Sequence, residues 1–174
     1  MHDVFMNPDH IPLWRAAIRG EVVDWAELFS GYSAAVDWPA ALFWPEISAA
    51  FPDAIVVLSL RDAEAWWTSA RETVFSVIEG VDEKGDLSEW KAMMNELIRF
   101  RFTPDLSDRD ACIAAFERHS EVVRREVPTD RLVVWEAGEG WEPICSALQI
   151  PVPATPYPVI NTREQFLARN AKTS

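Results

Sequence analysis

The chain has 174 residues, 49% of them hydrophobic and 25% charged, a composition typical of one soluble globular domain with a sizeable core. Acidic residues outnumber basic ones by 28 to 16, and the net charge of −12 repels a nucleic-acid backbone, so no nucleic-acid partner is expected. The sequence opens without a charged-then-apolar leader, and no window reaches the roughly 18 apolar residues that a membrane span needs. Cys112 and Cys145 lie in apolar periodic segments, which favours buried free thiols and a cytoplasmic setting.

Two short helices are predicted near the start of the chain. Asp9 and an early proline precede the apolar stripe of residues 12–18, and Gly20 follows it as a stop signal. Asp24 is a second capping residue, and the apolar positions after it have helical spacing. Both helices are expected to bury one face.

A short strand is predicted over residues 34–38. The segment is apolar apart from Asp37, and Pro39 then blocks further ladder bonding, so the strand should end near Asp37. A helical segment between Pro39 and Phe51 is expected to follow.

Residues 54–60 form the clearest strand pattern in the sequence. The run is continuous and rich in β-branched residues, which predicts burial on both faces of a parallel sheet. Asp62 then caps a long helix. Helical spacing predicts that the buried face of this helix comprises Trp66, Ala70, Val74 and Val77.

Helix and strand continue to alternate to the end of the chain, which predicts an α/β fold with a parallel sheet flanked by helices. The expected elements are helices over 90–98, from Asp108 onward and over 141–148, a strand over 132–135, and a tight turn at 138–140. Four prolines in residues 150–161 predict an extended surface strap. Thr162 and Gln165 form a capping box for a short helix in residues 162–174. Residues 1–174 are expected to form a single domain.

Arg61 and Ser69 are the candidate binding residues for a phosphate. Arg61 ends the strand of residues 54–60, and Ser69 lies eight positions on, about two turns into the next helix. Ligands gather at the carboxyl ends of parallel strands, and an arginine fork gives a phosphate two parallel charge-assisted hydrogen bonds. The alternative is that Arg61 pairs with Asp62 or Glu64 and that Ser69 is a neutral helix residue.

The segment Phe51–Ser69 resembles a sulfotransferase pattern: an aromatic residue, Pro-Asp-Ala, an apolar strand, Arg-Asp-Pro, then tryptophan and serine. Ala63 stands where that pattern has its second proline. Further segments agree with the same bacterial and fungal sulfotransferase-like group, namely residues 4–10, 31–39, 116–119 and 132–153, and Asn161. The resemblance implies a P-loop NTPase-like sulfotransferase fold and the cosubstrate 3′-phosphoadenosine 5′-phosphosulfate. It implies that Arg61 and Ser69 bind the 3′-phosphate, and that a sulfuryl group passes to a small hydroxyl or amine acceptor.

The sequence departs from this group at its start. Members begin with a strand and a Gly-x-x-Arg-Thr-Gly-Thr loop whose amides hold the phosphosulfate, and none of the 6 glycines here forms such a loop. The resemblance therefore predicts an N-terminally truncated fold that does not transfer sulfuryl groups by itself. The missing strand would lie between the strands of residues 54–60 and 132–135. Those two strands must then pair directly, or a second copy must fill the gap, which would give a homodimer by strand exchange.

The catalytic base is less strongly specified. Other sulfotransferases place a histidine or glutamate near the end of the strand before the arginine, and Asp37 lies at a comparable position. The alternative is that Asp37 is a hydrogen-bonded carboxylate ending that strand. His119 lies on an apolar helix face, which favours a core histidine, and Trp66 or Trp67 are candidates to flank an adenine ring. No His, Cys, Asp and Glu set has metal-ligand spacing, so no metal is expected.

Two other function classes compete with a sulfotransferase. One is a non-catalytic α/β protein that binds a nucleotide or acts as an oligomeric scaffold. The other is a nicotinamide-dependent enzyme, which the absence of a Gly-x-Gly-x-x-Gly segment disfavours. The sequence leaves open whether the chain is an enzyme and does not specify an acceptor.

Overall fold

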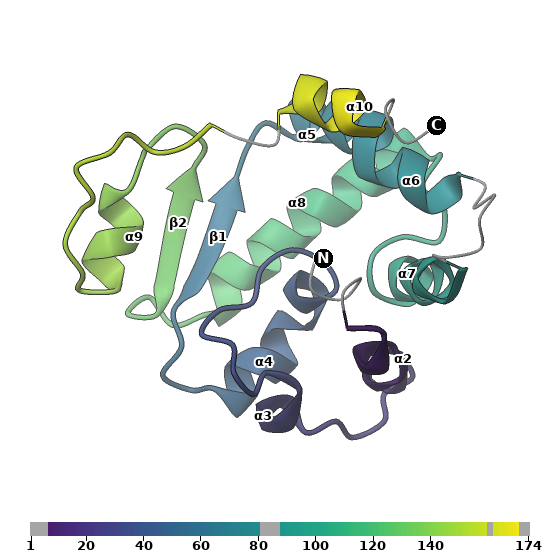
Figure 1. The fold of residues 1–174 in the computed structure, drawn as a ribbon, viewed down its shortest axis with the longest axis horizontal. Helices are drawn as coiled ribbons and strands as arrows, with labels where there is room; N and C mark the ends of the chain where they lie inside the picture. Colours follow the sequence, from purple (N-terminus) through teal and green to yellow (C-terminus); the bar gives the residue numbers. More distant parts are fainter. Residues whose placement is uncertain (1–6, 81–87, 160–161, 171–174) are drawn as a thin grey trace. The chain divides into compact units, whose positions relative to one another are not determined.

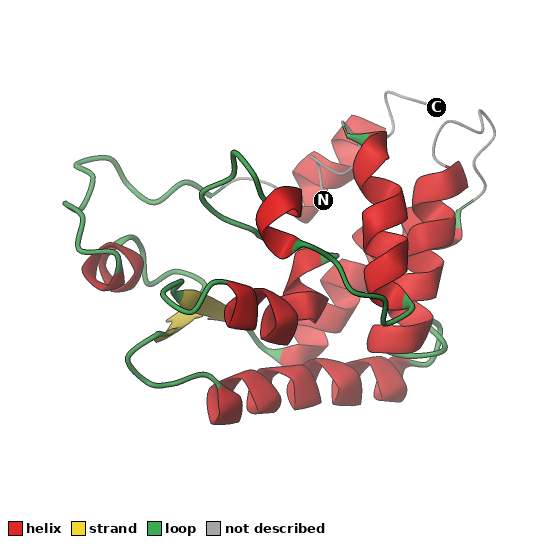
Figure 2. Cartoon of the chain, turned by 90° about the horizontal axis from the view of Figure 1, so that it is seen from below, coloured by secondary structure: helices red, strands yellow, loops and turns green. Residues whose placement is uncertain are grey.

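The computed structural model describes residues 7–80, 88–159 and 162–170 (Figure 1). The chain divides into two compact units, each assembled from two stretches of sequence. The first unit comprises Met1–Pro52 and Ile78–Ser107, and the second comprises Asp53–Val77 and Asp108–Ser174. Helices dominate the described chain, and its two strands both belong to the second unit (Figure 2). The single domain expected over residues 1–174 stays a prediction.

In the first unit, α2 (Ile11–Ile18) packs along α7 (Ser88–Arg101). The predicted helix before Gly20 is thus confirmed, but Asp9 does not cap it. A 3₁₀ turn, η1 (Pro8–His10), runs directly into α2, so Asp9 lies inside a helical turn and not at its boundary.

The next helix of this unit, α3 (Trp25–Leu28), begins as predicted. The Asp24 carboxylate accepts hydrogen bonds from the amides of Ala26 at 2.9 Å and Glu27 at 3.0 Å. These bonds satisfy two of the amides that every helix start leaves without a partner. The helix spans a single turn and buries Leu28.

The strand predicted over residues 34–38 is wrong. Residues 34–36 have no regular structure, and Asp37 has φ of 67°, a left-handed conformation that a strand cannot contain. The helical segment predicted to follow is confirmed as η2 (Ala40–Phe43) and α4 (Trp44–Ala50). The apolar residues before Asp37 therefore serve a loop, with no second strand in the described part of this unit for them to pair with.

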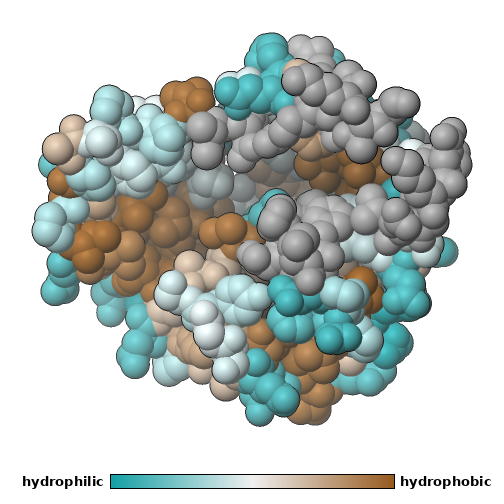
Figure 3. Space-filling model, viewed as in Figure 1, coloured by the Kyte–Doolittle hydropathy of each residue, from teal (hydrophilic) through white to brown (hydrophobic). Residues whose placement is uncertain are grey.

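The sheet of the second unit consists of β1 (Val56–Leu60) and β2 (Leu132–Glu136). The strands are parallel and pair directly in register from Val56 with Leu132 to Leu60 with Glu136. Direct pairing is one of the two arrangements that the sequence predicts. The expected burial on both faces is wrong, because Leu58 is the one fully buried residue of β1 and Val57 is 43% exposed. Figure 3 shows apolar surface over these strands and α9.

The helix after β1 is continuous but changes its geometry. It consists of α5 (Ala63–Ala70), a π-helical turn, η3 (Arg71–Phe75), and α6 (Ser76–Glu79). The wider turn adds one residue to the helical repeat, so the buried positions move by one. Phe75 and Ile78 are buried, at 1% and 2% exposed. Uninterrupted helical spacing predicts Val74 and Val77 as the buried residues instead.

The remaining helices of the second unit surround this frame. α8 (Arg109–Glu126) is capped by Asp108 as predicted and packs against β1 and α5, and α9 (Glu142–Ala147) packs against β2 (Figure 1). The described part of the proline-rich strap, residues 150–159, is irregular as expected. Its Tyr157 ring lies 5.3 Å from the ring of Trp135 and 4.5 Å from that of Trp141.

The last helix, α10 (Arg163–Asn170), has the predicted capping box. The Thr162 amide donates to the Gln165 side chain at 3.2 Å, and the Gln165 amide donates to the Thr162 hydroxyl at 3.3 Å. Asn161 lies outside the described residues. In the ranges 7–80, 88–159 and 162–170, none of the helices combines the length and hydropathy that crossing a bilayer requires.

Candidate functional site

Arg61 stands at the junction between β1 and α5. Its exposed side chain follows the last residue of the strand, and its Nη2 donates a hydrogen bond to the Ala65 carbonyl oxygen at 3.2 Å. The next residue, Asp62, caps α5 by accepting a bond from the Ala65 amide at 2.8 Å. Strand end, cap and first helical turn therefore fix the backbone of Arg61 at the carboxyl end of β1, where parallel sheets bind ligands.

Ser69 is a partly buried residue of α5, four positions after Ala65. In an α-helix, the Ala65 carbonyl accepts the amide four residues on, which is that of Ser69. The Arg61 guanidinium bonds to this same carbonyl, so it lies beside the backbone of Ser69. The structure thus places the Arg61 guanidinium against the helix that carries Ser69, and a joint phosphate site of the two residues stays a prediction.

The carboxylates next to Arg61 are engaged elsewhere. Asp62 is occupied by the helix cap, and Glu64 forms an ion pair with Arg109, which also bonds to Asp110 at 2.6 Å. The hydrogen bond to Glu64 raises the pKa of Arg109 above its ordinary value. Across the described chain, Arg61 has no ion pair, so the alternative in which it pairs with Asp62 or Glu64 is not observed. One donor of its five is used.

The helix that carries Ser69 is also held by side-chain contacts. The Thr73 hydroxyl donates to the Ser69 carbonyl at 2.6 Å, inside the π-helical turn. Trp66, a candidate for adenine stacking, is stacked on Phe116 with 4.4 Å between ring centroids and 15° between planes. Its ring also meets Phe75 edge-on at 6.0 Å. Trp66 therefore ties α5 to α8.

The segment Gly138–Gly140 is the tight turn that the sequence predicts. Both glycines have positive φ, 108° and 80°. The Glu139 carboxylate accepts the Glu136 amide at 2.6 Å, and the Trp135 indole donates to the Gly140 carbonyl at 3.0 Å. A carboxylate bound to the backbone here repels an incoming phosphate, so this turn cannot serve as a phosphate loop.

Asp37 belongs to the first unit. It is exposed, and its carboxylate accepts a bond from the amide of the next residue, Trp38, at 2.7 Å. Its carbonyl oxygen accepts the Ala41 amide at 2.9 Å and so begins the turn into η2. The carboxylate is hydrogen-bonded, as the alternative to a catalytic role expects, although it ends a loop and not a strand.

Two other sequence predictions concern buried groups. His119 on α8 is half-buried, and burial lowers its pKa below the ordinary value, as expected of a core histidine that stays neutral. Cys112 and Cys145 are buried free thiols, as predicted. Within the described residues, no group of three or more His, Cys, Asp and Glu side chains is placed to hold a metal ion.

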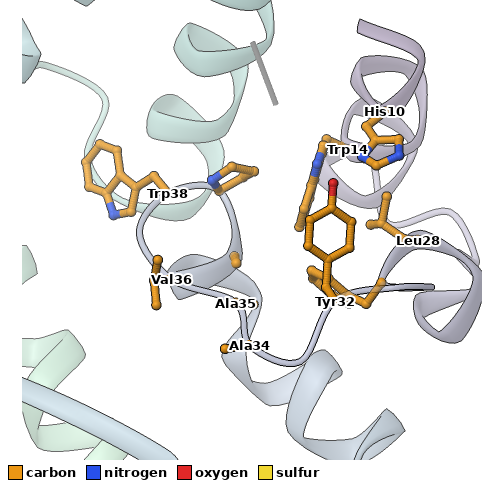
Figure 4. Close-up of a pocket in the computed structure, with 11 residues that line it drawn as sticks. His10, Trp14, Leu28, Tyr32, Ala34, Ala35, Val36 and Trp38 are labelled. Carbon is orange, nitrogen blue, oxygen red and sulfur yellow. The ribbon is translucent and has the colours of Figure 1, made fainter. Parts of the chain in front are cut away.

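One feature of the first unit has no counterpart among the sequence predictions. A pocket lies between α2 and the loop of residues 34–40, and Trp14, Tyr32 and Trp38 are among its walls (Figure 4). Helical spacing assigns most tryptophans to the core, and Trp14 is indeed buried. Only the local density of aromatic residues between positions 10 and 40 could have signalled a pocket.

Comparison with known proteins identifies the family. A family model described as a sulfotransferase domain matches residues 1–166. The chain belongs to this family. Ava biosynthesis cluster protein M of Aspergillus versicolor is 30% identical over 183 residues, a match that covers 93% of this chain and 70% of the relative.

Membership of the sulfotransferase family indicates the general type of chemistry. The family in general uses 3′-phosphoadenosine 5′-phosphosulfate as the sulfuryl donor, and the matched range includes Asp37, Arg61 and Ser69. The name of the Aspergillus relative speaks of a biosynthesis cluster and of no reaction.

Proposed function

We propose that this sulfotransferase domain serves the transfer of a sulfuryl group from 3′-phosphoadenosine 5′-phosphosulfate to a small hydroxyl or amine acceptor. Arg61 and Ser69 bind the 3′-phosphate of the donor. The observation that carries the proposal is the state of Arg61, an exposed guanidinium at the carboxyl end of β1 with a single bond to a carbonyl and no ion pair in the described chain.

The chemistry of these two side chains fits a phosphate monoester. A guanidinium can bind two phosphate oxygens in parallel, and such charge-assisted bonds are worth roughly 1.5–3 kcal/mol each. The Ser69 hydroxyl adds a neutral donor from the same helix face. Turning from the Ala65 carbonyl to a phosphate replaces a bond to a neutral acceptor at 3.2 Å with bonds to an anion.

The phosphosulfate end of the donor has no comparable set of binding residues in this sequence. The 174-residue sequence contains no Gly-x-x-Arg-Thr-Gly-Thr loop. The Gly138–Gly140 turn after β2 contains the Glu139 carboxylate instead. We further propose that β1 and β2 are two strands of a P-loop NTPase-like sheet whose phosphosulfate-binding part these residues do not supply. The 174-residue polypeptide alone is then inactive, because no backbone donors stabilise the transferred group.

Asp37 is the proposed base that accepts the proton of the acceptor hydroxyl. Its carboxylate is exposed, so a substrate can reach it, but it must exchange its bond to the Trp38 amide for one to the acceptor. Replacement by asparagine keeps the size and the bond to Trp38 and removes the basicity. Asp37→Asn should therefore lose turnover in an active form of the domain while keeping its affinity for the donor.

Calorimetric titration with adenosine 3′,5′-bisphosphate tests the phosphate site. Arg61→Ala should weaken binding by roughly 10- to 100-fold, and Ser69→Ala by roughly 3- to 10-fold. Arg125→Ala is the matched control, since Arg125 is an exposed arginine of the same unit that pairs with Glu126. Adenosine 5′-monophosphate, which lacks the 3′-phosphate, should bind the wild type and Arg61→Ala equally. Equal affinity of the wild type and Arg61→Ala for the bisphosphate contradicts the proposal.

A turnover assay with 3′-phosphoadenosine 5′-phosphosulfate and a panel of phenols, alcohols and amines tests the inactivity. The wild-type 174-residue chain should give no product above background with any acceptor. Clear turnover would show that some other group stabilises the phosphosulfate, and it would leave the role of Arg61 to the titration.

A second candidate function is a non-catalytic scaffold that assembles with another copy of itself. The observation that favours it is the exposure of apolar side chains of the small sheet, of which Val57 and Val134 are 43% and 39% exposed. Light scattering distinguishes the two candidates. A 19.8 kDa particle at all concentrations contradicts the scaffold and strand exchange, whereas a stable dimer with no bisphosphate binding supports the scaffold.

A further inference from the structure

Glu64 is a carboxylate close to Arg61 in the chain. It lies three positions after Arg61 and directly before Ala65, whose carbonyl oxygen accepts the Arg61 hydrogen bond at 3.2 Å. Long side chains around a helical turn can meet over such a separation, and both of these are exposed. The helix itself accounts for Glu64, because the dipole at the start of α5 favours an acidic residue in the first turn.

Arg109 binds Glu64 from a different helix. It is the first residue of α8, and its Nη2 bonds to Glu64 Oε1 while its Nη1 bonds to Asp110 Oδ1 at 2.6 Å. A cation in the first turn of a helix is unfavourable, because it faces the positive end of the helix dipole. The formation of α8 therefore gives no reason for an arginine at this position, whereas the two carboxylates do.

The stability of the fold does not account for the pair of Arg109 and Glu64 either. The two side chains are 47% and 60% exposed, and ion pairs with such exposure contribute little to stability. The packing of α5 on α8 has its own contact, the stack of Trp66 on Phe116 with 4.4 Å between ring centroids. What the pair does change is the charge beside Arg61, since it occupies the Glu64 carboxylate.

We propose that Arg109 is a positioning residue of the phosphate site, which keeps the Glu64 carboxylate away from the Arg61 guanidinium. The inference rests on the proposed function in one respect, that the ligand of Arg61 is a phosphate. It explains why Arg61 bonds only to a carbonyl oxygen in the described chain although a glutamate lies three positions away. Arg109 itself does not touch the phosphate.

Removal of Arg109 should give Glu64 a new partner. Arg61 then exchanges its bond to the neutral Ala65 carbonyl for a charge-assisted bond to the carboxylate, which is the stronger of the two. A phosphate must displace Glu64 before it can bind the guanidinium. Because the new pair would also be exposed, the competition should weaken phosphate binding by roughly 2- to 5-fold.

Nuclear magnetic resonance of the arginine Nε–H groups tests the inference without any ligand. Spectra are recorded at mildly acidic pH, where these protons exchange slowly with water, and Arg61→Lys identifies the Arg61 signal by its loss. The signal should shift in Arg109→Ala, because the guanidinium gains a carboxylate partner. It should return to the wild-type position in the double variant Arg109→Ala/Glu64→Gln. An Arg61 signal that stays unchanged in Arg109→Ala overturns the inference.

Calorimetric titration with adenosine 3′,5′-bisphosphate measures the consequence for binding. Arg109→Ala should weaken binding by roughly 2- to 5-fold, Glu64→Gln should leave it unchanged, and the double variant should bind as the wild type does. This pattern is non-additive, as expected of residues that act through one contact. If Arg109 only added positive charge near the phosphate, Glu64→Gln would tighten binding and the two effects would add. Additive effects therefore overturn the inference.

Asp108→Ala is the control for a merely structural effect. It weakens the cap of α8 next to Arg109 and keeps the Arg109 side chain, so it should lose more stability in urea than Arg109→Ala and still bind the bisphosphate as the wild type does. The proposed function is judged separately, by Arg61→Ala. Should Arg61→Ala bind the bisphosphate as tightly as the wild type, the phosphate site fails, while the Arg61 signal in Arg109→Ala still decides whether Arg109 keeps Glu64 from Arg61.

Discussion

Two arginines of the first unit and one arginine of the second unit are used differently. In the first unit, Arg15 pairs with Glu96 and Arg101 pairs with Glu46, and both pairs are partly buried. In the second unit, Arg61 stands exposed at the end of β1 and bonds only to a carbonyl oxygen. With 28 acidic and 16 basic residues, the chain has enough carboxylates to pair with every arginine, yet Arg61 has no carboxylate partner in the described chain. The comparison separates arginines that stabilise the fold from one that is available to an anion.

Arg101→Ala should give the largest loss of stability in this comparison. The side chain bonds to Glu46 at 2.7 Å, and its guanidinium lies 4.3 Å from the centre of the Phe43 ring. Removing it leaves a partly buried carboxylate unpaired, and we expect a loss of about 2 kcal/mol in the free energy of unfolding. Urea denaturation measures this loss. Arg61→Ala in the same experiment should change the free energy by less than about 0.5 kcal/mol, and equal losses would remove the distinction between the two arginines.

Asp62→Ala should have a smaller effect on stability and a specific effect on binding. The substitution removes the cap of α5, which costs about 1 kcal/mol, and it loosens the backbone that positions Arg61. Asp108→Ala is the matched control, because Asp108 caps α8 through the same kind of bond at 3.0 Å. Both variants should lose similar stability by urea denaturation, while only Asp62→Ala loses affinity for adenosine 3′,5′-bisphosphate by calorimetry. Parallel losses of affinity would mean that stability alone explains both.

The pH dependence of stability should show the smallest effect, through His119. Burial lowers the pKa of this histidine in the folded state below its ordinary value of 6.5, so the unfolded chain binds its proton more readily. The contribution of His119 is therefore constant at pH well above 6.5. As the pH falls through 6.5 toward the lower folded pKa, protonation of the unfolded chain makes the fold less stable.

His119→Gln keeps a polar side chain of similar reach and removes this titration. Thermal unfolding followed between pH 8 and pH 5 should show a steeper decline for the wild type than for His119→Gln. Identical declines would assign the pH dependence to other groups, such as the carboxylates.

Local chemistry made much of the fold predictable from the sequence. Asp24, Asp62 and Asp108 each cap a helix because a carboxylate near free helical amides acts over a few residues, and a pattern of that range is visible in the sequence. The positions of the two strands follow from local runs of apolar, β-branched residues, whereas their direct pairing was one of two arrangements that the sequence left open. The position of Arg61 after the strand and of Ser69 in the next helix also follows from short-range spacing.

The incorrect predictions concern features that depend on contacts between distant parts of the chain. Residues 34–38 are as apolar as a strand, but no strand in the described unit is there to pair with them, and Asp37 adopts a left-handed conformation. The exposure of Val57 depends on whether another element covers its face of the sheet, which the β1 sequence does not encode. The pocket beside Trp14 was missed because its walls come from a helix and a loop whose spacing carries no pattern.

The π-helical turn at Arg71–Phe75 shifts the rotation of side chains about the axis of the helix after β1. Residues before the turn, Ser69 among them, follow the cap at Asp62, whereas Phe75 and Ile78 after it are buried. A regular α-helix would force one rotation on both sets, so improving the packing of one would misalign the other. Because of the extra residue, the face of α5 that carries Ser69 and the buried face after the turn are not bound to one rotation.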